Sequence, residues 1–245
     1  MKTRLRVNRI LIAGCSCILL FSACQQRQTV MLDRLQSLDA KGYNGQPASP
    51  AHIKELKAAL DKYRKIVAEK VSAADSATEY YKMLALAYIE DKMYGLALDA
   101  LSDAVRLEPE NPVLFYYAGV SAARMGKGEL NPQTGQTYLD RAERYYRRAI
   151  ALDPTYSDAE YGLGVLLTFE LNRPLDAEPV VKQLLQQQKN DTDAMFLLAR
   201  IYVVTGRVED AASLYEKIAQ TTRDAQVRQQ AEQNRKQLLE RNANG

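Results

Sequence analysis

The chain has 245 residues, 47% of them hydrophobic and 26% charged, an ordinary balance for a globular protein that buries a sizeable core. Its formal net charge of +3 depends on four basic residues within residues 1–23; without them, 29 basic side chains face 30 acidic ones. A near-neutral mature chain argues against nucleic acid as the partner, because such binding needs a basic face. The single histidine, His52, excludes chemistry that requires two.

Residues 1–23 have the layout of a secretory signal. The basic segment MKTRLRVNR precedes an apolar run from Ile10 to Phe21, which is too short to span a bilayer. The ending LLFSAC is similar to a lipobox, at which bacteria attach diacylglycerol to a cysteine thiol and cleave just before it. All three cysteines lie at positions 15, 17 and 24, so the mature chain has no disulfide framework. We therefore predict a lipoprotein-type signal peptide and a lipid anchor, with acyl chains such as palmitate, on Cys24.

Two alternatives to this anchor remain open. The segment LIAGC, which ends at Cys15, matches the lipobox pattern better locally, but its preceding apolar run would be very short. The same residues also suit an ordinary cleaved signal or an uncleaved anchor.

Two segments separate the signal from the first clear repeat. Residues 24–49 are predicted to be a tether with a possible short helix, which GYNGQPASP ends. Residues 50–77 are predicted to hold an extra N-terminal helix or a degenerate repeat. Ser49 and Pro50 suit a helix start, and apolar residues recur every three or four positions to about Lys70.

From about Thr78 the chain repeats a pattern of two amphipathic helices. The copies at 78–111 and 192–225 have small and large residues at the same offsets: Tyr81, Leu84, Ala85, Tyr88, Ala97, Leu101, Ala104 and Pro109 in one, and Leu198, Ala199, Tyr202, Gly206, Ala211, Tyr215 and Ile218 in the other. This pattern resembles the tetratricopeptide repeat, a helix–turn–helix unit of 34 residues. Chance spacing in a generic helical bundle is the alternative.

Two further copies lie between these. The copy at 112–156 contains Phe115, Ala118, Gly119, Ala142, Tyr146 and Pro154, with 23 positions between Gly119 and Ala142 against 12 between Ala85 and Ala97. We expect an 11-residue insertion in or near MGKGELNPQTG, residues 125–135, as an exposed loop. The copy at 157–191 is weaker, because Glu160 occupies the place of a large aromatic residue. Residues 226–245 are polar enough for a capping helix and tail.

The resemblance implies an all-α fold, a right-handed α-solenoid of about four repeats with an extra N-terminal helix and a C-terminal capping helix. It also implies a concave groove that binds a peptide or helix of a partner. The groove residues that follow from the family geometry are Lys82, Leu86, Tyr116, Val120, Arg124, Tyr161, Val165, Phe196 and Arg200. The family's lysine and asparagine clamp for a terminal carboxylate is not expected, because only Lys82 suits it. Filling of the groove by the protein's own terminal helix is the alternative.

These patterns predict a lipid-anchored interaction scaffold of the bacterial envelope, on the inner or outer membrane and facing the periplasm. Its partners would be envelope proteins, and the sequence leaves their identity and the oligomeric state open. A ligand-delivery protein that holds an apolar small molecule or lipid in the concave face is the alternative function. We expect no enzymatic activity, no cofactor and no metal, because no nucleophile–base pair, cofactor loop or metal-ligand spacing occurs.

Overall fold

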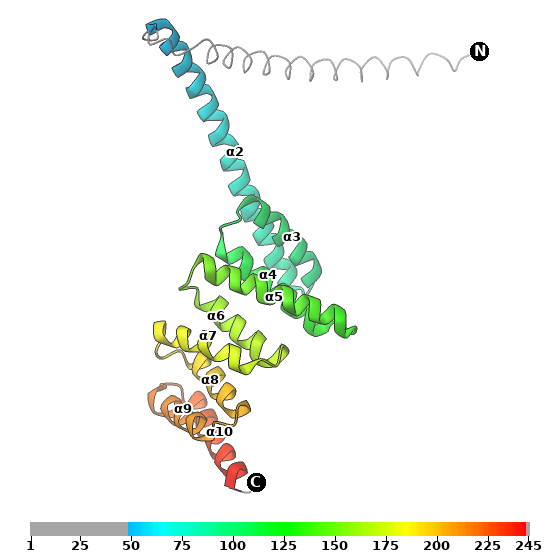
Figure 1. The fold of residues 1–245 in the computed structure, drawn as a ribbon, viewed down its shortest axis with the longest axis vertical. Coiled ribbons are helices and arrows are strands. Elements are labelled where there is room, and N and C mark those ends of the chain that lie inside the picture. Colours follow the sequence, from blue (N-terminus) through cyan, green and yellow to red (C-terminus); the bar gives the residue numbers. More distant parts are fainter. Residues whose placement is uncertain (1–48, 244–245) are drawn as a thin grey trace, which may run out of the picture. The chain divides into compact units, whose positions relative to one another are not determined.

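A computed structural model describes residues 49–243, which are helical apart from short connections (Figure 1). The signal peptide, Cys24 and the tether before Ser49 lie outside the described residues. No strand occurs between residues 49 and 243, and the all-α prediction is confirmed. The helices are α2 (Pro50–Glu90), α3 (Tyr94–Leu107), α4 (Pro112–Gly128), α5 (Pro132–Leu152), α6 (Ser157–Val165), the π-helical turn η1 (Leu166–Glu170), α7 (Pro174–Gln187), α8 (Thr192–Val204), α9 (Val208–Thr221) and α10 (Ala225–Ala243).

The described residues divide into two units, with the boundary between Lys65 and Ile66, inside α2. In the first unit, the apolar side chains of Ile53, Leu56 and Leu60 are exposed. The second unit contains the repeats, and it begins with the remainder of α2.

Helix α2 continues without a break past residue 77, where we had placed a boundary between two segments. Residues 71–77 contain neither glycine nor proline, so nothing in them interrupts a helix. The hydroxyls of Ser76 and Thr78 donate to the carbonyl oxygens of Ser72 and Ala74, one turn back, which satisfies both side chains within the helix.

In the second unit the helices form four stacked pairs. The end of α2 lies beside α3 and shares one core cluster with it (Figure 1). Helix α4 pairs with α5, α6 and η1 with α7, and α8 with α9, while α10 packs against α9. Small residues, all buried, lie at the same place in every pair: Ala85, Ala97, Gly119, Ala142, Gly164, Ala177, Ala199 and Ala211. One pair cannot bury its apolar face alone, and stacking joins the pairs into a continuous core. The solenoid prediction is confirmed.

The 11 extra residues of the second pair lengthen its two helices, so the prediction of an exposed loop is wrong. Helix α4 ends nine residues after Gly119, whereas the first helices of the first and last pairs end five residues after Ala85 and Ala199. Helix α5 begins ten residues before Ala142, against three residues in α3 and α9. Only residues 129–131 connect α4 and α5. The insertion thus adds about one turn to α4 and two turns to α5, which keeps the packing faces in phase.

The third pair carries one extra residue, and a π-helical turn absorbs it. The small positions Gly164 and Ala177 are 13 apart, whereas Ala199 and Ala211 are 12 apart. The amide of Leu171 donates to the carbonyl oxygen of Leu166, five residues earlier, at 3.0 Å. A π-turn is the usual result of one residue inserted into a helix.

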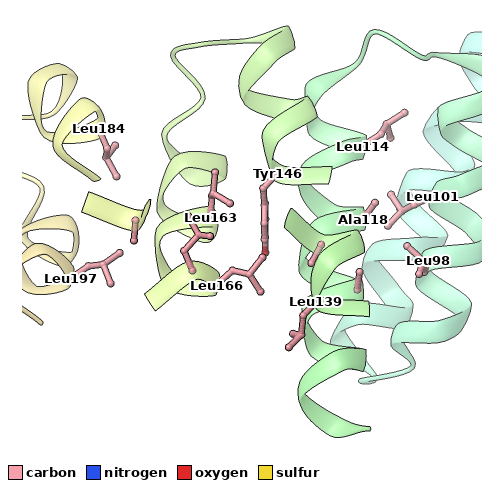
Figure 2. Packing of buried hydrophobic residues seen from close by; sticks show 14 of the residues in the cluster. Leu98, Leu101, Leu114, Ala118, Leu139, Tyr146, Leu163, Leu166, Leu184 and Leu197 are labelled. Carbon is pink, nitrogen blue, oxygen red and sulfur yellow. The ribbon is translucent and has the colours of Figure 1, made fainter. Parts of the chain in front are cut away.

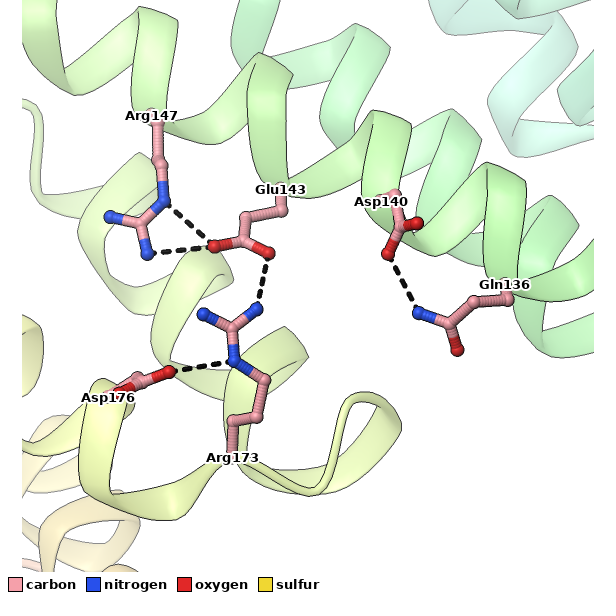
Figure 3. A network of polar contacts seen from close by, with 6 residues as sticks. All are labelled: Gln136, Asp140, Glu143, Arg147, Arg173 and Asp176. Atoms are coloured by element: carbon pink, nitrogen blue, oxygen red, sulfur yellow. Dashed lines mark hydrogen bonds and ion pairs between the residues drawn. The ribbon is translucent and has the colours of Figure 1, made fainter.

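Ion pairs tie the second helices α5 and α7 to the next repeat. In α5, Glu143 accepts from Arg147 on its own helix and from Arg173 in the turn before α7, both at 2.8 Å (Figure 3). In α7, Glu178 accepts from Arg207 in the turn before α9. The same contact thus recurs 34 or 35 residues later and fixes neighbouring pairs against each other.

Tyr146 of α5 lies between α4 and α6 and sets the distance between these helices (Figure 2). A methyl group added at Gly119 of α4 would lie 2.8 Å from the Tyr146 ring, and one added at Gly162 of α6 would also lie 2.8 Å from it. Carbon atoms do not pack this closely, so both positions require glycine for the ring to fit.

We predict that Gly119→Ala lowers the free energy of unfolding by about 1–3 kcal/mol, because the added methyl group forces the buried ring to move. The matched control is Gly128→Ala, where nothing lies within 4 Å of the added atom and alanine favours the helix. Urea denaturation of both variants measures the difference. Equal stability of the two variants would contradict this packing.

Candidate functional site

A pocket of about 280 Å³ opens between the first helices of the second and third pairs. We call it the α4–α6 pocket. It brings together five of the predicted groove residues: Tyr116, Val120, Arg124, Tyr161 and Val165. Ala123, Lys127, Tyr146, Gly162, Leu166 and Glu170 complete its lining.

The walls of the α4–α6 pocket are aromatic and aliphatic. The rings of Tyr116 and Tyr146 are 6.2 Å apart at their centroids, and Tyr161 lines the pocket from α6 with a third of its surface exposed. Burial raises the pKa of Tyr146, Tyr116 and Tyr161 above the usual tyrosine range, with nearby acidic groups as a smaller cause for Tyr161. These hydroxyls therefore stay protonated and neutral at physiological pH.

Charged side chains lie at the rim of this pocket. Lys127 of α4 and Glu170 of η1 form an ion pair of 2.8 Å that joins the second and third pairs. Arg124 is exposed and forms no ion pair with any residue between 49 and 243. The pocket thus offers one uncompensated positive charge beside an aromatic wall.

A second pocket, of about 360 Å³, lies at the C-terminal end and contains the predicted residues Phe196 and Arg200. We call it the α8–α10 pocket. Its other lining residues are Val203, Tyr215, Asn234, Gln237, Leu238 and Arg241. The C-terminal helix α10 therefore lines this end of the groove, whereas the α4–α6 pocket is lined by repeat helices alone.

The remaining predicted residues, Lys82 and Leu86, line neither pocket. Lys82 forms an ion pair with Glu79 on the same helix at 2.7 Å, and Leu86 is half-buried. Tyr146 and Tyr215 also line the pockets, although only first-helix positions were predicted to form the groove. Both occupy the same second-helix position in the repeat, and this shared position is the signal present in the sequence.

The sequence model of the tetratricopeptide-repeat family matches residues 168–232, from η1 into α10. The chain contains tetratricopeptide repeats. A "TPR repeat-containing protein" of Borreliella burgdorferi is 19% identical over 184 residues, which cover 75% of this chain and 78% of that protein.

Two solved structures share the tetratricopeptide-repeat fold with this chain. TTC0263, "a thermophilic TPR protein" of Thermus thermophilus, superposes with a TM-score of 0.55 at 20% identity, covering 64% of this chain and 80% of that one. YrrB, described as "a TPR protein with an unusual peptide-binding site", superposes with a TM-score of 0.51 at 23% identity, covering 75% and 86%.

The part of the chain that the structure describes contains no group of three or more histidine, cysteine or acidic side chains placed to hold a metal ion. None of its helices is both long enough and apolar enough to cross a membrane.

Glu160 of α6 is a buried carboxylic acid that lines neither pocket. It is 0% exposed, and its Oε1 accepts a long contact of 3.4 Å from Gln187 of α7. Its Oε2 has no hydrogen-bond partner among the described residues. Burial raises the pKa of Glu160, the nearby Gln183 side chain lowers it in part, and the charge of Asp153 raises it. The anionic form is therefore disfavoured in the folded chain.

We predict that Glu160→Gln stabilises the protein by about 1 kcal/mol at pH 7, because the amide removes a buried charge. A raised folded-state pKa means that Glu160 stabilises the fold below the unfolded pKa of about 4.3 and loses this contribution as the pH rises through the folded value. The advantage of the variant therefore shrinks as the pH falls and vanishes below about pH 4.

Thermal denaturation from pH 4 to pH 8 measures this dependence. Glu110→Gln, at an exposed position, is the matched control and is expected to show no such trend. An advantage of Glu160→Gln that is the same at every pH would contradict a raised pKa.

Proposed function

We propose that this protein is a lipid-anchored interaction scaffold of the bacterial envelope, which binds a peptide or helix of an envelope protein along its concave face. The α4–α6 pocket is the observation that carries the proposal. There, two first helices present aromatic and aliphatic side chains to solvent, and the polar groups lie at the rim. Such a surface suits an apolar side chain that projects from a bound segment.

The open rim of the α4–α6 pocket favours a protein segment over a lipid or a small apolar ligand. Sites for small molecules usually bury most of the ligand. In the α4–α6 pocket, which has a volume of about 280 Å³, the wall residue Tyr161 and the rim residues Arg124 and Lys127 are exposed. The pocket therefore has room for one large side chain, with the remainder of the bound segment outside it.

The comparisons agree with this choice at the level of the fold. YrrB is described as having a peptide-binding site. A shared fold does not by itself decide function, so the proposal rests on the α4–α6 pocket and includes no catalysis.

The proposed anchor rests on the sequence of residues 1–24. Cys24 follows the lipobox-like segment, and acyl chains on this cysteine would hold the groove at the membrane surface. Attachment raises the local concentration of the groove near envelope partners, so that a modest intrinsic affinity is sufficient.

The direct test is photo-crosslinking in living cells of the source bacterium. We place p-benzoylphenylalanine at Tyr161, on the pocket wall, and at Arg144 as a control on an exposed face of α5. We expect a defined adduct from position 161 and none from position 144. The adduct is expected to disappear when Val120→Gln and Val165→Gln are added, because two polar side chains then fill the apolar pocket.

Two controls make this result decisive. Circular dichroism must show that the double variant is helical and melts close to the native temperature. Cys24→Ser, with its product followed by fractionation, is expected to move the protein from the membrane to the soluble fraction. Persistence of the adduct in a folded double variant would reject the groove, and membrane retention of Cys24→Ser would reject the anchor.

A further inference from the structure

We infer that the two concave pockets select an acidic amphipathic segment, one in which carboxylates flank a large apolar or aromatic side chain. This inference rests on the proposed groove function and specifies its partner class.

The two pockets share one construction. The α4–α6 pocket combines Tyr116 of a first helix, Tyr146 of its paired second helix and a wall from the next first helix, α6. The α8–α10 pocket combines Phe196, Tyr215 and α10, which takes the place of the next first helix. The equivalent ring pairs lie at 6.2 Å and 6.0 Å. The groove thus repeats an aromatic pocket, and each copy has room for one large side chain.

An unpaired arginine accompanies each aromatic pocket. In the α4–α6 pocket, Glu170 neutralises Lys127, which leaves the charge of Arg124 without an acidic partner among the described residues. In the α8–α10 pocket, Arg200 and Arg241 are the charged lining residues, and neither forms an ion pair with a residue between 49 and 243. Both pockets therefore have a net positive charge, although the mature chain as a whole is close to neutral.

Apart from Glu170, which pairs with Lys127, the acidic residues near the groove lie at helix starts and line neither pocket. Asp158 lies in the first turn of α6 and Asp193 in the first turn of α8, where a negative charge favours the helix. Asp191 accepts a hydrogen bond from the amide of Ala194 and caps α8. They leave Arg124, Arg200 and Arg241 available to a ligand.

The combination of an aromatic pocket with an unpaired arginine defines the chemistry of the bound segment. An apolar or aromatic side chain enters the pocket, and a carboxylate one or two residues away accepts hydrogen bonds from the guanidinium at the rim. A segment with lysines in the acidic places would bring like charges together and lose affinity.

The absence of tryptophan from the chain provides a fluorescence assay without background. The probe is a synthetic dodecapeptide with one Trp flanked by four Glu. Two otherwise identical peptides carry Gln or Lys in place of Glu. Titration of the full-length protein in detergent, at about 50 mM salt, is expected to shift the Trp emission to the blue as the indole enters a pocket. We expect the Glu peptide to bind at least about tenfold more tightly than the Lys peptide, with a difference that shrinks at high salt.

Arginine variants test the source of the preference. Arg124→Gln and Arg200→Gln are each expected to weaken binding of the Glu peptide by roughly threefold to fivefold. The triple variant, in which Arg241→Gln is added, is expected to bind all three peptides nearly equally, because no unpaired arginine then lines either pocket. Arg144→Gln removes an exposed arginine that lines neither pocket, and it should leave the preference unchanged.

The outcomes separate this inference from the proposed function. Equal binding of the three peptides to the native protein would overturn the acidic preference and leave the apolar groove in place. If no peptide bound while the crosslink at position 161 still formed, the acidic preference would likewise be overturned and the groove function would be retained. Absence of both peptide binding and the crosslink would reject the inference and the groove function together.

Discussion

The arrangement of this protein depends on one kind of contact, in which a large aliphatic or aromatic side chain of a second helix packs against small residues of first helices. Tyr146 fills the space between Gly119 and Gly162, and an added carbon at either glycine would lie 2.8 Å from the ring. This contact sets the separation of α4 and α6. It also leaves the Tyr146 ring as a wall of the pocket between them, so the residue that joins two repeats also forms part of the candidate site.

The sequence predicts this packing because the contact is encoded at fixed offsets. Small residues at Ala85, Gly119, Gly164 and Ala199 are visible without a structure, and each marks where two helices approach closely. The spacing between those marks is less informative. It shows that 11 residues are added after Gly119, but ELNPQTG contains residues that are typical both of loops and of helix starts. In the structure Asn131 caps α5 and Pro132 begins it.

Two further differences between the predicted and the observed helices arise because residue spacing alone does not show the path of the backbone. A single extra residue between Gly164 and Ala177 is within the tolerance of any repeat alignment, and only backbone geometry shows that a π-turn absorbs it. The continuity of α2 across residue 77 follows from the absence of helix breakers. The predicted boundary at residue 77 marks where the repeat pattern begins, and a single helix continues across this position.

The candidate site was predictable in its positions and not in its chemistry. First-helix residues such as Tyr116 and Tyr161 follow from the repeat register. The charge of a pocket depends instead on which side chains meet across repeats. Glu170, 43 residues away, compensates the charge of Lys127 in an ion pair. Arg124 on the same helix forms no ion pair with any of the described residues. The α8–α10 pocket further requires the docking of α10, whose polar sequence carries no repeat pattern.

The central claim is that the concave pockets are the surface on which a partner binds. The most direct test is an NMR titration of the protein, carrying isotope-labelled tyrosine rings, with the partner segment recovered by crosslinking. The account predicts that the signals of Tyr116, Tyr146, Tyr161 and Tyr215 shift, while those of Tyr80 and Tyr138, which line neither pocket, stay in place. Shifts confined to Tyr80 or Tyr138, with the pocket tyrosines unmoved, would contradict it.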